Sequence, residues 1–127
     1  EMAEIGTRVI VEPLNPAIRE NAMLTTSDET MDLLNEIGHP NLGLEYDAFH
    51  MHVTEGNMAE TVQKYLSHIG NIQIADVPGR HEPGTGSIDY NAFLGALDTM
   101  GYSNWVACEY TPVGSTIDGL GWLQNWL

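Results

Sequence analysis

Carboxylate and amide side chains recur along the chain at intervals of 35, 26 and 36 residues, at Glu12, Asp47, Gln73 and Glu109. Each lies at or near the end of a short apolar run. Asp76 competes with Gln73 for the third place, because it lies nearer the end of its run and is chemically the better metal ligand. Spacing alone does not decide between the two. The simplest alternative is that all of them are ordinary polar residues that face solvent.

Three carboxylates that meet in one place repel one another and do not all stay ionised without a compensating charge. A divalent cation turns that repulsion into binding energy. Because the ligand set is rich in oxygen, it favours Mg²⁺ or Mn²⁺ over Zn²⁺, which prefers nitrogen and sulfur. The residue types therefore predict a metal site, provided that the fold brings them together.

The pattern around these residues predicts an α/β fold with a parallel sheet, since short β-rich runs alternate with longer helical patterns in four βα units. In parallel α/β folds the carboxyl ends of the strands face one crevice, so side chains spaced by whole βα units converge there. The long polar loop 76–89 has the length of a functional or disordered segment. Strands are expected at 8–12, 42–47, 71–75 and 105–109, and helices at 28–37, 58–68, 90–100 and in a glycine-interrupted stretch that ends at 122–127.

Composition restricts the partners. Eighteen acidic against four Lys and Arg residues give a formal net charge of −14 over 127 residues. Nucleic acids and anionic membranes are bound through basic side chains, so both are poor partners. No apolar run approaches the roughly 20 residues that span a bilayer, and a single cysteine, Cys108, favours a reducing compartment such as the cytoplasm. With 43% hydrophobic residues, we expect one domain over 1–127.

Four segments carry a resemblance to a known family: VEPLNP (11–16), YDAFHMH (46–52), IQIADVPGRHEPGTGSIDY (72–90) and VACEYTP (106–112). They resemble the hydroxypyruvate isomerases, which belong to the xylose-isomerase-like TIM-barrel superfamily together with sugar epimerases. The opening residues lack an initiator Met and read as a helix end, a stop at Gly6 and then a strand. The resemblance therefore implies the C-terminal half of a TIM (β/α)8 barrel, with the first four βα units missing.

The resemblance also implies roles for residues. It places the metal on Glu12, Asp47, Gln73 and Glu109, and it favours Gln73 over Asp76, because this branch has Gln where many relatives have His. Glu12 and Glu109 resemble the family's pair of proton-transfer carboxylates. The implied reaction, an aldose-ketose type isomerisation, interconverts hydroxypyruvate and tartronate semialdehyde through an enediolate, with Mg²⁺ or Mn²⁺ as cofactor.

His50 and Arg80 resemble the family's contacts to substrate oxygens. Without the resemblance, a lone histidine in FHMH is better interpreted as a structural residue. From composition alone, Arg80 is as well explained by a surface ion pair with Asp76 or Glu82 as by a clamp on a substrate carboxylate. His52, His81 and Glu82 are expected to support the loop structure.

Other functions remain open. The same ligands serve a ketose or sugar 3-epimerase. A non-catalytic half-barrel remnant is another interpretation. Its two edge strands and uncovered apolar sheet interior predict self-association, for example of two copies that complete a barrel, unless the missing N-terminal half is present. An abasic-site endonuclease of the same superfamily is disfavoured, because it needs more histidine ligands and a basic DNA-facing surface.

Overall fold

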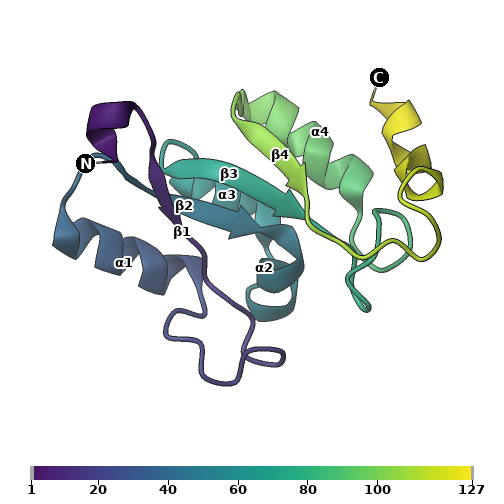
Figure 1. The fold of residues 1–127 in the computed structure, drawn as a ribbon, viewed down its shortest axis with the longest axis horizontal. Coiled ribbons are helices and arrows are strands. Elements are labelled where there is room, and N and C mark those ends of the chain that lie inside the picture. The colour runs from purple at the N-terminus through teal and green to yellow at the C-terminus, as the bar shows by residue number, and fades with distance from the viewer. Residues whose placement is uncertain (1, 127) are drawn as a thin grey trace.

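Four parallel strands form one sheet in the order β1-β2-β3-β4, with helices between successive strands (Figure 1). The structure is a computed structural model that describes residues 2–126. Glu1, at the start of the expected opening helix end, and Leu127, at the end of the expected final helix, lie outside the described residues. The strands are β1 (Val9–Val11), β2 (Leu42–Asp47), β3 (Ile69–Ile74) and β4 (Trp105–Cys108). The predicted α/β fold with a parallel sheet is confirmed.

The helices follow the predicted order with one addition. A helix over Ala48–Thr54 was not expected, the segment expected at 58–68 ends as a helix at Tyr65, and the last segment is a 3-10 helix. The first long helix begins one residue earlier than expected, because Thr26 is its N-cap and forms a capping box with Glu29. The helical elements are η1 (Ala3–Ile5), α1 (Ser27–Ile37), α2 (Ala48–Thr54), α3 (Met58–Tyr65), α4 (Tyr90–Met100) and η2 (Asp118–Asn125).

One face of the sheet packs against the helices. Side chains alternate between the two faces of a strand, and those of Leu44, Tyr46, Ile72 and Ile74 are fully buried on the helical side. They pack with residues of α1, α3 and α4, which include Met31, Leu34, Val62, Phe93 and Leu97. Burial of each large apolar side chain contributes roughly 1.5–3 kcal/mol. The sheet is thereby fixed as a platform for the residues on its other face.

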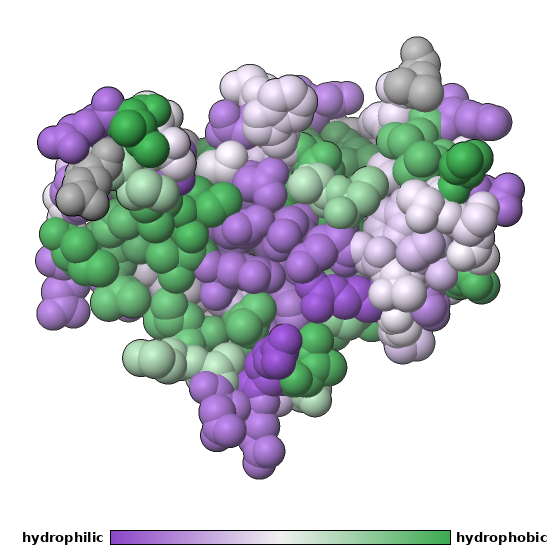
Figure 2. All heavy atoms as spheres, in the orientation of Figure 1, coloured by the Kyte–Doolittle hydropathy of each residue, from purple (hydrophilic) through white to green (hydrophobic). Residues whose placement is uncertain are grey.

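The opposite face of the sheet is polar, and Figure 2 shows hydrophilic atoms gathered over its centre. The Arg8 side chain lies over Gly43, where an added Cβ would come within 2.7 Å of the guanidinium carbon. Farther along, Asn71 donates a hydrogen bond to Glu45. The expected apolar interior is therefore found only in part, since Ile10 also lies on this face, where a Cβ at Gly70 would come within 2.6 Å of Ile10 Cγ2. Side chains alternate along β2 and β3, so the apolar ones point toward the helices and the polar ones point to this face.

The two outer strands of the described sheet, β1 and β4, each pair with one neighbour only. Trp105 on β4 is 82% exposed. A closed (β/α)8 barrel has eight such units, so four units with two free edges correspond to half of one. The assignment to the C-terminal half stays a prediction. Within residues 2–126, no helix is both long and apolar enough to cross a membrane.

Candidate metal and acid–base site

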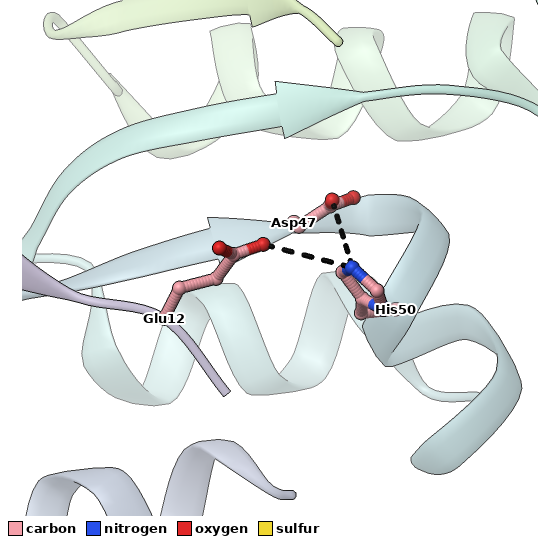
Figure 3. Close-up of side chains that lie close together, drawn as sticks. All are labelled: Glu12, Asp47 and His50. Carbon is pink, nitrogen blue, oxygen red and sulfur yellow. Dashed lines mark ion pairs between the residues drawn. The ribbon is translucent and has the colours of Figure 1, made fainter. Parts of the chain in front are cut away.

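The structure brings three side chains together at the carboxyl ends of β1 and β2. Glu12 directly follows β1, Asp47 is the last residue of β2, and His50 lies on α2. One ligand atom from each lies within 4.8 Å of the other two (Figure 3). Two of these residues belong to the predicted ligand set, and His50 was expected to contact the substrate.

Helix α2 explains why His50 reaches this place. Asp47 is the N-cap of α2, and its Oδ1 accepts a hydrogen bond from the backbone N–H of Phe49 over 2.8 Å. One helical turn then brings His50 back over Asp47, with Nε2 lying 3.6 Å from Asp47 Oδ2 and 3.7 Å from Glu12 Oε1. Helix α2 was not predicted, although Asp47 is a favourable N-cap residue.

The hydrogen bonding of His50 determines which ring nitrogen carries its proton. The backbone N–H of Asn15 donates to Nδ1 over 3.1 Å, so a neutral ring carries its proton on Nε2. The side chain is 1% exposed, and burial lowers its pKa to about 4. At neutral pH, His50 therefore presents an Nε2–H donor to the two carboxylates, and in that form Nε2 has no lone pair for a metal.

Burial and mutual repulsion disfavour the charged forms of both carboxylates. Desolvation, with the charges of Asp47 and Glu109 adding to it, raises the pKa of Glu12 to about 7. Burial also raises the pKa of Asp47 to about 6, although its hydrogen bond from Phe49 and the charge of Arg80 oppose the shift. The site would therefore hold added positive charge favourably.

Arg80 supplies positive charge from the loop after β3. Its Nη2 donates to Asp47 Oδ2 over 3.1 Å and also to Glu109 Oε2, and its guanidinium lies 5.2 Å from the centroid of the Phe49 ring. Its ion-pair partners are thus carboxylates of the site. The alternative of a surface pair with Asp76 or Glu82 is wrong.

Gln73 and Asp76 have different environments. Both Asp76 carboxylate oxygens are used inside the loop 76–89, where Oδ1 accepts from Val77 and Ile88 and Oδ2 accepts from Gly84. Gln73 lies beside Asp47 in the sheet register, and its buried Oε1 has no hydrogen-bond partner among the described residues. This difference favours Gln73 as the residue that is available for a ligand.

Glu109 is less closely associated with the site. It directly follows β4, its side chain is 48% exposed, and it meets Asp47 through the Arg80 guanidinium. It does not belong to the group of atoms within 4.8 Å. Glu12 and Asp47 therefore lie close together, whereas Glu109 is connected to Asp47 through the guanidinium of Arg80.

Two loops are tied together beside Arg80. The ring of His81 donates from Nδ1 to the carbonyl of Thr111 over 2.6 Å, and Glu82 accepts the N–H of Val113 over 3.0 Å. Both residues serve loop structure, as expected. Within the same loop Gly86 is tightly enclosed, since a Cβ there would lie 2.1 Å from the Val77 carbonyl oxygen. The loop is thus held in one form by backbone contacts.

The donor set fits a hard divalent cation. Oε1 of Glu12 and Oε1 of Gln73 are both buried without a hydrogen-bond partner among the described residues, and buried polar atoms seldom stay unsatisfied. Carboxylate and amide oxygens are the ligands that Mg²⁺ and Mn²⁺ prefer. Glu12, Asp47 and Gln73 would hold such an ion, whereas Glu109 lies outside the close group and contacts Arg80 instead.

In (β/α)8-barrel enzymes, the active site lies at the carboxyl ends of the parallel strands. The carboxylates of this chain lie at the same end of its sheet. The family model described as "Xylose isomerase-like TIM barrel" matches residues 1–126, and the chain belongs to this family.

Curated relatives carry isomerase names. The chain is 38% identical over its full length to a 2-oxo-tetronate isomerase of Pectobacterium atrosepticum, of which it covers 48%. It is 36% identical to the hydroxypyruvate isomerase of Escherichia coli K12, with 93% of this chain and 46% of that protein covered. The chain thus spans about half the length of the curated relatives that it matches.

Solved structures of the same fold carry more varied names. The chain has a TM-score of 0.93 and 33% identity to an AP endonuclease of family 2 from Brucella melitensis, with 98% of this chain and 48% of that chain covered. It has a TM-score of 0.85 and 27% identity to a 3-keto-D-glucoside 4-epimerase from E. coli, with the same coverages. A third neighbour, the IOLI protein with a zinc atom, has a TM-score of 0.69 and 25% identity, with 88% and 43% covered.

Proposed function

We propose that the protein is a metal-dependent isomerase that interconverts hydroxypyruvate and tartronate semialdehyde by proton transfer through an enediolate. The observation that carries the proposal is the close group of Glu12, Asp47 and His50, together with the unpartnered buried oxygens of Glu12 and Gln73. The names of the curated relatives support an acid substrate of this kind. Because the chain spans about half of those relatives, the activity is proposed for the whole protein.

The reaction removes a proton from C3 of hydroxypyruvate and returns one to C2, while the hydroxyl proton on the C3 oxygen passes to the C2 oxygen. Glu12, whose Oε1 is buried without a hydrogen-bond partner among the described residues, is one of the two carboxylates that transfer the proton. Glu109 is the second carboxylate, and we assign no order to the two. His50 donates its Nε2–H to a substrate oxygen that gains charge in the enediolate. Mg²⁺ or Mn²⁺, when bound, polarises the substrate oxygens and offsets that charge.

Arg80 supports an acid rather than a neutral sugar as substrate. A guanidinium binds a carboxylate through two parallel hydrogen bonds, and Arg80 already lies within the site. A sugar 3-epimerase or isomerase is the second candidate, since several solved neighbours are named as epimerases. An endonuclease is less favoured, because a net charge of −14 opposes binding to DNA.

The cytoplasm is the proposed compartment, because the single cysteine, Cys108, cannot form an internal disulfide.

The test is proton NMR of hydroxypyruvate in D₂O with Mg²⁺ or Mn²⁺, beside a panel of ketohexoses. We expect deuterium exchange and isomerisation of hydroxypyruvate, loss of both on chelation of the metal, and a loss of at least about a hundredfold for Glu12→Gln, as for removal of a general base. Glu20→Gln, at an exposed position, is the matched control and should keep full activity. Turnover of ketohexoses alone would establish the epimerase instead, and turnover of no substrate would favour the non-catalytic remnant.

A further inference from the structure

Asp47 Oδ2 lies between two nitrogen groups of unequal charge. Arg80 Nη2 donates to it over 3.1 Å, and Nε2 of the neutral His50 lies 3.6 Å away. The same Arg80 nitrogen also donates to Glu109. Among the described residues, Arg80 is therefore the basic residue that pairs with both Asp47 and Glu109.

The backbone of Arg80 is fixed although its side chain is long. Its φ of 55° lies in the left-handed region, its N–H donates to the carbonyl of Asp76 over 3.0 Å, and its carbonyl accepts the N–H of Thr111 over 2.9 Å. The ring of Phe49 lies against the guanidinium. Only the side-chain torsions are left to move the charge away from Asp47.

We propose that Arg80 is the counter-cation of the metal-free site and that a divalent metal has to displace it from Asp47. This inference rests on the metal site of the proposed function. Two cations at one carboxylate oxygen repel each other, so the ion and the guanidinium exchange rather than share that position. Exchange releases the guanidinium from Asp47 and leaves it beside the bound metal, in contact with Glu109, where an anionic substrate needs a partner.

The first experiment is calorimetric titration with Mn²⁺ alone. Arg80→Gln should bind Mn²⁺ at least about tenfold more tightly than the wild type, because the competing charge is removed. Arg80→Lys keeps the charge and should stay within about threefold of the wild type. Lys64→Gln is the matched control, since Lys64 pairs with Asp28 on the exposed surface, and its Mn²⁺ affinity should equal that of the wild type.

Thermal unfolding gives a second readout without activity. Metal-free Arg80→Gln should melt at a lower temperature than the wild type, and saturating Mn²⁺ should raise its melting temperature more than it raises that of the wild type. In the wild type itself, the ¹⁵N resonance of the Arg80 side chain should move on saturation with diamagnetic Mg²⁺. This last measurement needs no variant and holds even if Arg80→Gln fails to fold.

Equal Mn²⁺ affinity of Arg80→Gln and the wild type, or an Arg80 resonance that Mg²⁺ leaves in place, would overturn the inference while the metal site stands. Absence of Mn²⁺ binding to the wild type and to Arg80→Gln alike would instead remove the metal site, and the proposed function with it.

Discussion

The backbone amide of Asn15, in the loop after β1, donates a hydrogen bond to Nδ1 of His50 on α2. Asn15 is 3% exposed, and its Oδ1 accepts the N–H of Ala17 over 2.8 Å, which closes a small turn and directs the amide. The loop of one βα unit thereby sets the proton position on a ring that belongs to the next unit.

Long-range ¹H–¹⁵N NMR should find His50 neutral and protonated on Nε2 at pH 7. The Asn15 amide occupies Nδ1, and burial lowers the pKa to about 4, so the His50 signals should not titrate between pH 5.5 and 8. A ring protonated on Nδ1, or one that titrates near the ordinary histidine value of about 6.5, would contradict the assignment of His50 as an Nε2–H donor.

Substitutions at Gln73 and Asp76 should have different effects, one on metal affinity and the other on the free energy of unfolding. Asp76→Asn replaces an acceptor of three backbone N–H groups, so it should cost about 1–3 kcal/mol of unfolding free energy and leave Mg²⁺ affinity within about threefold. Gln73→Leu removes an unpartnered buried oxygen and should keep the stability while it lowers Mg²⁺ affinity about tenfold. Urea denaturation and calorimetry measure the two effects. The reverse pattern would move the third ligand to Asp76.

The stability of the metal-free protein should depend on Glu12. Its pKa rises from 4.5 to about 7, mainly through burial, so between these pH values the folded state binds more protons than the unfolded chain and loses stability as pH rises. Glu12→Gln removes this slope. Its advantage over the wild type should grow across pH 4.5–7 and level off near 1–2 kcal/mol, an approximate value discounted for a side chain that is 27% exposed.

Urea denaturation at several pH values, without metal, measures this difference. Glu20→Gln, at an exposed position, is the control for the loss of one carboxylate. Parallel pH profiles of the wild type and Glu12→Gln would show that Glu12 does not retain its proton in the folded state.

Self-association through the free edges of β1 and β4 stays a prediction. Edge strands with unpaired backbone groups pair readily with other chains, and the exposed Trp105 lies on β4. We expect dimers in sedimentation velocity at micromolar concentration and a weaker tendency, by about tenfold in dissociation constant, for Trp105→Ser. A compact monomer at these concentrations would refute the prediction.

Local sequence patterns were sufficient for most of the fold. The alternation of apolar runs with helical spacing located β2 and α4 at their observed bounds, and the glycines at 6, 38 and 101 end their helices in the left-handed conformation. The one missed helix, α2, is short and follows β2 without a loop. Its seven residues are too few for a helical spacing to stand out from the strand before it.

The candidate site was predictable in its residue types but not in its contacts. Strand-end spacing led to Glu12 and Asp47, which the structure does bring together. The ion pair of Arg80 with both Asp47 and Glu109 depends on how the loop 76–89 folds. That fold depends on contacts between Asp76 and backbone amides up to 12 residues away, which no local pattern reports.

The enclosure of Gly86 limits which other chains share this loop. Its missing side chain leaves room for the Val77 carbonyl and the Asp76 carboxylate, so a larger residue forces the backbone apart where Asp76 gathers its three amides. A related sequence that carries alanine or anything bulkier at this position must route the segment differently and deliver its arginine along another path. One glycine thus becomes a marker for sorting uncharacterised homologues by the form of their binding loop.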